Sequence, residues 1–125
     1  MDTGSRAPPP DRYTVIARDI PFSLSRSQIE TDSPNFFTAA FLEHDFAEAS
    51  SRRLRVDTHP KLFALIVDYL SGYDILPLTD KTVPDTMSVD VAMKNLLKDA
   101  DYFQLDSLSP KLATPPPAPP WPRYF

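Results

Sequence analysis

Residues 33–72, SPNFFTAAFLEHDFAEASSRRLRVDTHPKLFALIVDYLSG, decide the fold of this chain. In order, they predict an aromatic-rich helix, a charged loop, a short strand and an amphipathic helix. The amphipathic helix is the clearest element, because its apolar residues recur at i, i+3, i+4 and i+7, the spacing of one helical face. They are Phe63, Ile66, Val67 and Leu70, flanked by Leu62 and Tyr69. Thr58 and Pro60 are typical of the start of such a helix, and Gly72 is typical of its end.

The first helix of this segment is expected to begin at Ser33 and Pro34. Serine is a good N-cap, and proline suits the first helical position because its missing amide hydrogen is not needed there. The large apolar residues that follow fall on one broad helical face: Phe36, Phe37, Ala40 and Phe41. Because buried aromatic rings contribute strongly to folding, we interpret this face as core rather than as a binding surface.

Between the two helices, residues 53–57 alternate between charged and apolar side chains, which predicts a strand. Leu54 and Val56 would face inward and the charged residues outward. Three arginines form a small basic patch here: Arg52, Arg53 and Arg55. The chain carries a formal net charge of −4. We therefore interpret the patch as an exposed strand face rather than as a nucleic-acid site.

Two short strands are predicted upstream, within residues 12–24. Apolar and polar residues alternate on both sides of a bend, which is expected at residues 19–21 (Asp-Ile-Pro) because proline fixes one backbone angle. A short helix should begin at Ser25. Ser25 and Gln28 have the spacing of a capping box, in which each side chain satisfies a free backbone amide.

A further helix is predicted over residues 88–103. Its buried stripe comprises Val89, Met93, Leu96, Ala100 and Phe103, with Leu97 beside it. Its polar residues are expected on the solvent side: Lys94, Lys98, Asp99 and Asp101. Leu105 and Leu108 predict one last helical turn, which Pro110 should end.

Composition limits the classes of protein that fit. A chain of 125 residues suits one compact domain, and 42% apolar residues supply a modest core. The absence of cysteine excludes disulfides and thiolate metal sites, and it fits an intracellular protein, cytoplasmic or nuclear. No apolar run approaches the roughly 20 residues of a membrane helix, and no signal peptide follows Met1. The acidic balance argues against nucleic acid as a partner.

The two ends of the chain differ from the rest in composition. Residues 1–11 are interpreted as a disordered N-terminal arm, residues 12–112 as the folded domain and residues 113–125 as a proline-rich tail. The tail favours an extended polyproline conformation, which suits the aromatic grooves of small adaptor domains. Its three aromatic side chains are costly to leave in water, so they are expected to pack on the domain or on a partner.

The charged loop that follows the first helix contains the candidate site residues His44, Asp45, Phe46 and Glu48. Histidine and carboxylates can ligate metals, but a short charged loop after a helix is usually solvated, so no metal site is predicted. Phe46 is a large apolar side chain among charges. From the residues alone, it either packs back onto the core or anchors a partner with Glu48 beside it.

No constellation of catalytic residues is visible in the sequence. Two glycines in the whole chain leave no glycine-rich phosphate loop, and neither a nucleophile motif nor a paired-histidine metal motif occurs. The sequence therefore predicts a non-enzymatic protein without cofactors. An unrecognised enzyme stays as a distant alternative, because a fold can bring together carboxylates that are far apart in sequence.

The order of these elements resembles the BTB/POZ fold over residues 13–112. Three motifs carry the resemblance: Ser33, Pro34 and Phe36; Pro60, Phe63, Tyr69, Leu70 and Gly72; and Leu97, Ala100, Tyr102, Phe103 and Leu105. The resemblance implies an α/β protein of the α+β type. In that fold a small three-stranded sheet packs against a cluster of about five helices.

Within this superfamily, residues 22–27, FSLSRS, resemble the start of the potassium-channel tetramerisation-type branch, which includes soluble adaptors. The zinc-binding cysteines of some channel domains are absent, so the resemblance implies no zinc. No membrane span follows the domain, so the chain itself is not expected to be a channel.

Members of this family self-associate, and many bind the cullin scaffolds of ubiquitin ligases through a hydrophobic-x-Glu motif after the Ser-Pro helix. Phe46, Ala47 and Glu48 match that motif in that place, with one residue inserted relative to common members. The resemblance thus implies a homo-oligomer that recruits a cullin through residues 44–48. A purely structural oligomerisation module without cullin binding is the alternative.

Overall fold

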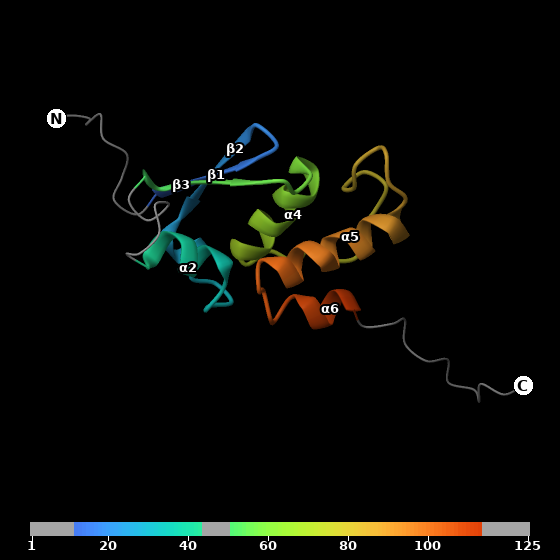
Figure 1. The fold of residues 1–125 in the computed structure, drawn as a ribbon. Helices are drawn as coiled ribbons and strands as arrows, with labels where there is room; N and C mark the ends of the chain where they lie inside the picture. Colours follow the sequence, from blue (N-terminus) through green and yellow to red (C-terminus); the bar gives the residue numbers. More distant parts are fainter. Residues whose placement is uncertain (1–11, 44–50, 114–125) are drawn as a thin grey trace, which may run out of the picture.

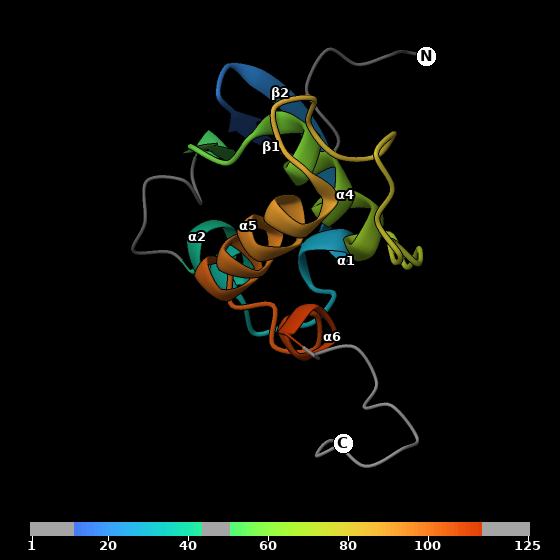
Figure 2. The ribbon, with the colours of Figure 1, turned by 90° about the vertical axis from the view of Figure 1, so that its right-hand side faces the viewer.

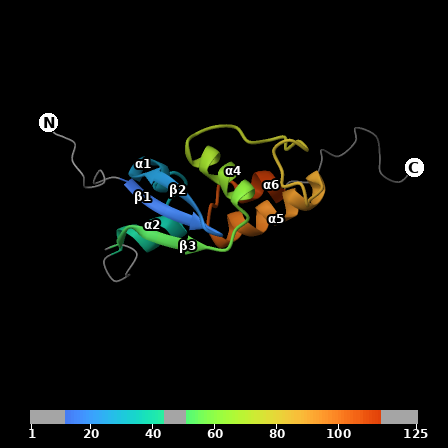
Figure 3. The ribbon, with the colours of Figure 1, turned by 90° about the horizontal axis from the view of Figure 1, so that it is seen from above.

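The computed structural model describes residues 12–43 and 51–113 of the chain. In chain order the elements are β1 (Arg12–Ala17), β2 (Ile20–Ser25), α1 (Arg26–Ile29), α2 (Phe36–Leu42), β3 (Arg53–Val56), α4 (Pro60–Leu70), α5 (Val89–Tyr102) and α6 (Ser109–Ala113). The sheet, α1 and α2 occupy one end of the molecule, α5 and α6 extend to the other, and α4 lies between them (Figures 1 and 3). The described ranges thus hold a three-stranded sheet and five helices, which confirms the expected α+β class.

β1 is the central strand of a mixed sheet with the order β2-β1-β3. It pairs antiparallel with β2 and parallel with β3, so that Val15 lies opposite both Phe22 and Leu54. These three residues share the face that packs on the core, because every second side chain of a strand lies on the same side. Arg53 and Arg55 lie on the opposite face and are exposed, as predicted.

The turn between β1 and β2 differs from the prediction. Its bend lies at Arg18 and Asp19, which both have positive φ angles (47° and 73°), and not at residues 19–21. Ile20 and Pro21 belong to β2 instead. Proline is tolerated there because β2 is an edge strand of the described sheet. An edge strand pairs with a neighbour on one side only, so a residue without an amide hydrogen is accepted there.

The starts of α1 and α5 agree with the prediction. At α1, the Ser25 hydroxyl accepts a hydrogen bond from the amide of Gln28 (3.1 Å), and the Gln28 side chain accepts one from the amide of Ser25 (2.7 Å). This is a complete capping box. At α5, the hydroxyl of Ser88 accepts from the amide of Val91 at 3.2 Å. Both serines satisfy amides that the first helical turn leaves free.

The start of α2 was predicted wrongly. Its N-cap is Asn35 rather than Ser33, and Pro34 lies before the helix rather than at its first position. The Asn35 side-chain oxygen accepts from the amide of Thr38 at 2.9 Å. The side-chain nitrogen of Asn35 donates to three main-chain carbonyls, those of Ile29 (3.0 Å), Thr31 (3.0 Å) and Asp32 (3.3 Å). This buried amide therefore fixes the chain path from α1 into α2.

The start of α4 is capped by a histidine. The Nδ1 atom of His59 accepts from the amide of Lys61 at 3.1 Å, and Pro60 takes the first helical position. Thr58, expected as the cap, is buried instead. The end of α4 agrees with the prediction, since Gly72 follows with a φ of +92°, a conformation that glycine adopts without strain.

The centre of the core is a cluster of phenylalanines from three helical segments. Phe37 of α2, Phe63 of α4 and Phe103 at the end of α5 are fully buried. Their ring centroids lie 4.8 Å (Phe37 to Phe103), 5.8 Å (Phe63 to Phe103) and 6.1 Å (Phe37 to Phe63) apart. Phe22 of β2 packs on Phe63 at 5.0 Å and so joins the sheet to this cluster. The interpretation of the aromatic face of α2 as core is confirmed.

The end of the described chain corrects one more prediction. Residues 105–108 form a non-helical turn, and the last helix, α6, begins at Ser109. Pro110 lies in its first turn rather than after its end. Proline is favourable there because the first-turn amides have no partner within the helix. Leu105 and Leu108 are buried. The two leucines from which a helical turn was predicted therefore hold a non-helical turn against the core.

α6 runs beside α5, and the start of α2 meets the C-terminal end of α5, where the amide of Phe36 donates to the carbonyl of Phe103 at 2.8 Å (Figures 1 and 2). The buried face of α5 is formed by Ala92, Leu96 and Ala100. Small side chains on this face let neighbouring helices approach closely, and both α4 and α6 contact α5. No helix of the described ranges is both long enough and apolar enough to cross a lipid bilayer.

Candidate functional site

The predicted site residues His44, Asp45, Phe46 and Glu48 lie outside the described residues, between residues 43 and 51. The same holds for residues 1–11 and for the proline-rich stretch 114–125. The two interpretations of Phe46, as core or as partner anchor, therefore stay predictions. The surfaces that can be examined for a site are those of the sheet and of the five helices.

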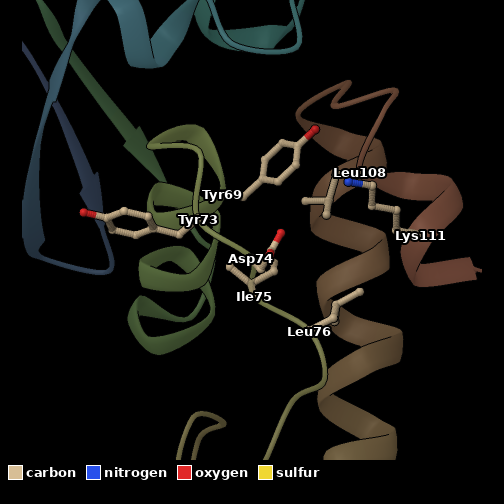
Figure 4. A pocket seen from close by; sticks show the side chains of 7 residues that line it. All are labelled: Tyr69, Tyr73, Asp74, Ile75, Leu76, Leu108 and Lys111. Atoms are coloured by element: carbon tan, nitrogen blue, oxygen red, sulfur yellow. The ribbon is translucent and has the colours of Figure 1, made fainter.

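A small pocket of about 80 Å³ lies between the end of α4, the loop after it and α6. Its lining residues are Tyr69, Tyr73, Asp74, Ile75, Leu76, Leu108 and Lys111 (Figure 4). In Figure 4, Tyr69 extends toward the α6 side, whereas the ring of Tyr73 points away from the other lining side chains. A hollow of this size accommodates one small side chain, but it is far smaller than the roughly 300–1,000 Å³ of a typical ligand pocket.

Asp32 links two segments beside this pocket through hydrogen bonds. The Tyr69 hydroxyl donates to Asp32 Oδ2 at 2.8 Å, and the amide of Ser107 donates to both carboxylate oxygens at 3.0 and 2.9 Å. Burial, the hydrogen bond to Asp32 and the charge of Asp32 all raise the pKa of Tyr69 above its usual value. The hydroxyl therefore stays protonated and donates, and we interpret this network as a brace between α1, α4 and α6.

A larger groove lies between α5 and the link from β3 to α4. It consists of two adjoining hollows of about 380 and 250 Å³. Both hollows are lined by Asp57, Thr58, Lys98 and Asp99. The larger one extends to Tyr102, and the smaller one extends to Arg18 on the β1–β2 turn and to His59. We call this surface, from Arg18 to Tyr102, the α5 groove.

Tyr102 forms one end of the α5 groove and is 61% exposed, unusual for so large a ring. Its position is nevertheless fixed, because its centroid lies 5.1 Å from Phe36 and 5.3 Å from Phe103. Phe36 packs in turn against the fully buried Phe37. A ring that is supported from below and open above is a suitable anchor for a partner molecule.

Asp99 lies in the middle of the α5 groove and was predicted on the solvent side of its helix. It is partly buried instead, and no hydrogen bond or ion pair to its carboxylate occurs within residues 12–43 and 51–113. Burial raises the pKa of Asp99 to about 6, an effect that the positive charge of Arg18 only partly opposes. Arg18 itself donates through Nε to the main-chain oxygen of Asp57 at 2.8 Å. The sequence missed this residue because the groups that bury it come from distant segments.

Replacing Asp99 by asparagine is expected to stabilise the domain at neutral pH. The folded-state pKa of about 6 is above the usual value of 3.8, so the fold favours the protonated form. The free energy of unfolding should therefore fall as the pH rises from about 4 to about 6, and Asp99→Asn should remove that slope. Allowing for solvent screening of a partly exposed group, we expect a rise in melting temperature of about 2–5 °C at about pH 7.5.

The matched control for this prediction is Asp101→Asn, on the exposed side of the same helix. Its melting temperature at about pH 7.5 should stay within about 2 °C of that of the wild type, as is usual for an exposed surface change. Thermal unfolding monitored by far-UV circular dichroism across this pH range measures both variants. If Asp99→Asn melts below the wild type near neutral pH, the carboxylate is stabilising and this account of the groove is wrong.

The α5 groove offers side chains that can recognise another molecule. In the part of the chain that the structure describes, no group of three or more His, Cys, Asp or Glu side chains could hold a metal ion. The groove contains carboxylates, which accept hydrogen bonds, and a tyrosine ring, which offers a flat apolar face.

Comparison with known proteins gives one informative similarity. No protein-family profile matches the chain. BTB/POZ domain-containing protein YLR108C of Saccharomyces cerevisiae is 34% identical over 87 residues, a match that covers 70% of this chain and 15% of that protein. The chain therefore spans a small part of the length of this relative. The similarity supports a relationship to the BTB/POZ superfamily, and the sheet and five helices are consistent with a small BTB/POZ fold.

Proposed function

We propose that this chain is a non-enzymatic protein–protein interaction domain of the BTB/POZ type. The observation that carries the proposal is the coincidence of two independent results. The chain folds as a three-stranded sheet packed on helices, and the curated relative that it matches over 70% of its length is named for a BTB/POZ domain. The exposed, supported ring of Tyr102 is also typical of a binding surface rather than of a catalytic cleft.

We assign the chain to the tetramerisation-type branch of the superfamily as part of the same proposal. Its support is the sequence FSLSRS at residues 22–27, which spans the end of β2 and the start of α1. Phe22 packs on Phe63, and Ser25 caps α1, so these residues shape the scaffold. On this proposal the domain assembles with further copies of itself.

Light scattering on the purified chain tests the assembly. The expected result is a mass that is a multiple of 14.1 kDa at about 50 µM protein, a concentration at which association with micromolar affinity is visible. A monomer under these conditions would count against any self-associating module, whether or not it binds a further partner.

The second part of the proposal is recruitment of a cullin scaffold through residues 44–48. The supporting argument is the position of the Phe46, Ala47 and Glu48 motif between α2 and β3, in the place that the family resemblance gives it. On this proposal Phe46 is the apolar anchor and Glu48 is the charged residue beside it, with His44 and Asp45 next to them in the sequence. A large apolar anchor next to one charge is a common composition for a binding hot spot.

Phe46→Ala and Glu48→Lys are expected to abolish capture of purified cullin, because each removes one half of the anchor. Loss of a hot-spot side chain typically weakens binding by about 2 kcal/mol or more, which is about 30-fold. The measurement is a pull-down with titrated cullin. The control variant is Glu43→Lys, an exposed carboxylate at the end of α2, which should bind as the wild type does.

Two outcomes would redirect this part of the proposal. An assembled wild-type domain that captures no cullin would favour a purely structural oligomerisation module. A melting temperature that drops by about 10 °C or more in Phe46→Ala would mean that Phe46 belongs to the core, since surface changes rarely cost more than about 0.5 kcal/mol.

A further inference from the structure

We propose that the α5 groove is a docking site for an arginine side chain of a partner protein. The proposal goes beyond self-association and cullin recruitment, because it assigns a partner's arginine to residues other than 44–48. In it, the carboxylates of Asp99 and Asp57 accept hydrogen bonds from the guanidinium group, and the ring of Tyr102 packs on its flat face.

The first argument is that the two carboxylates of the groove, those of Asp57 and Asp99, accept no hydrogen bond from the described residues. Asp99 is partly buried, yet no donor of the described residues reaches its carboxylate, and the Asp57 side chain is equally without a hydrogen bond there. Arg18, the cation on the β1–β2 turn, donates to the main-chain oxygen of Asp57 rather than to a carboxylate. A cation from outside would give these carboxylates the hydrogen bonds that Arg18 and Lys98 do not make in this structure.

The second argument is the placement of Tyr102 relative to Asp99. They are three residues apart on α5, so their side chains lie on neighbouring positions of one helical face. Both line the same hollow of about 380 Å³. A ligand that uses both must combine a flat cationic face with hydrogen-bond donors at its edge. The guanidinium group of arginine does so, whereas the ammonium group of lysine is a compact point charge without a face to stack.

The remaining basic side chains around the groove are Lys98 on α5 and His59 at the start of α4. Lys98 is exposed, and its flexible stem can turn its ammonium group out into solvent when another cation enters. It nevertheless competes electrostatically with the incoming arginine. Removing the charge of Lys98 should therefore tighten arginine binding, whereas removing the charge of Asp99 should weaken it.

The test uses two small probes and the full chain. Acetyl-arginine amide is compared with acetyl-citrulline amide, which has nearly the same shape but no charge, by NMR titration of the ¹⁵N-labelled protein. The arginine probe should give saturable shifts of the amides near Asp57 and along residues 98–102, with a millimolar dissociation constant. The dissociation constant of the citrulline probe should be at least about five times that of the arginine probe. The reason is that a charge-assisted hydrogen bond is roughly twice as strong as a neutral one.

Variants and pH complete the experiment. Asp99→Asn should remove the preference for arginine over citrulline, Asp101→Asn should keep it, and Lys98→Met should tighten arginine binding about two- to threefold. Because Asp99→Asn is expected to be more stable than the wild type, lost binding cannot be attributed to unfolding. Lowering the pH from about 7.5 to about 5 protonates Asp99 and should weaken arginine binding about fivefold.

Three results would overturn the proposal: equal binding of the two probes, an unchanged arginine preference in Asp99→Asn, or shifts confined to residues outside the groove. Each can be obtained whether or not the chain self-associates or captures a cullin, so failure here is distinguishable from failure of the proposed function.

Discussion

Phe63→Ala is expected to lower the free energy of unfolding by about 3–5 kcal/mol, the cost of truncating a buried aromatic residue. Phe63 is fully buried and contacts the rings of Phe22, Phe37 and Phe103. Its removal leaves a cavity where the sheet, α2 and α5 meet, and three aromatic neighbours cannot collapse into it together. At the lower end of the roughly 5–15 kcal/mol that is typical of a domain, this loss leaves a substantial unfolded population near body temperature.

Urea unfolding followed by far-UV circular dichroism measures this loss. Phe63→Leu keeps part of the volume and should lose about 1–2 kcal/mol, which places it between the alanine variant and the wild type. Tyr73→Ala is the exposed control, since that ring is 65% exposed and should change stability by less than about 0.5 kcal/mol. Equal urea midpoints for Phe63→Ala and the wild type would show that Phe63 does not lie at the centre of the core.

The position of Phe63 is also the part of the fold that the sequence predicts best. α4 is recognisable because its apolar residues keep a helical period and because Pro60 and Gly72 bound it. The aromatic face of α2 and the capping box of Ser25 are equally local signals. In each case residues within one turn of each other determine the structure, so no knowledge of distant contacts is needed.

The errors arise where distant contacts decide. Pro21 was placed in a bend, but an edge position in the sheet accommodates it in β2. Pro110 was expected to end a helix, but the packing of Leu105 and Leu108 lets a new helix begin beside it. The proline ring fixes its own φ angle in either kind of element. The neighbours of Pro21 and Pro110 in space, which the sequence does not give, decide which element each belongs to.

The same distinction between local and distant contacts explains which features of the candidate site the sequence predicts. Asp99 was expected in solvent because charged residues of an amphipathic helix usually lie on its exposed side, although its position flanks the buried stripe of Leu96 and Ala100. The β1–β2 turn and the β3–α4 link cover that position from 40 or more residues away in sequence, bringing Arg18 and Asp57 to it. Tyr102 was quoted as part of a motif, but its exposure depends on how Phe36 supports it. The loop residues 44–48 rest on sequence resemblance alone.

Asn35→Asp is expected to be as damaging as the loss of a core ring, although it changes one amide group to a carboxylate. The side-chain nitrogen of Asn35 lies 3.0–3.3 Å from three main-chain carbonyl oxygens, a contact that only a donor can make. A carboxylate oxygen in its place would face three acceptors from a residue that is 1% exposed. An uncompensated buried charge of this kind typically costs about 3–5 kcal/mol.

Comparison with Asn35→Ala separates the charge from the lost contacts. Alanine removes the cap of α2 and the three donated bonds but buries no charge, so it should cost about 2–3 kcal/mol. The aspartate variant keeps the cap, since its other oxygen can still accept from the amide of Thr38. If it is nevertheless the less stable variant near neutral pH, the repulsion between its charge and the three carbonyls is larger than the whole contribution of the cap.

The pH dependence of the difference between the two variants tests this reasoning directly. Because the fold disfavours the charged form, the folded-state pKa of the new carboxyl must be raised, and stability must be lost as the pH rises through that value. Urea midpoints of Asn35→Asp should therefore approach or exceed those of Asn35→Ala when the pH falls from about 7.5 to about 5. The alanine variant cancels all other titrations, that of Asp99 included. A constant difference across this range would mean that the carboxylate escapes to solvent, and that Asn35 does not hold the chain path between α1 and α2 in the way its hydrogen bonds indicate.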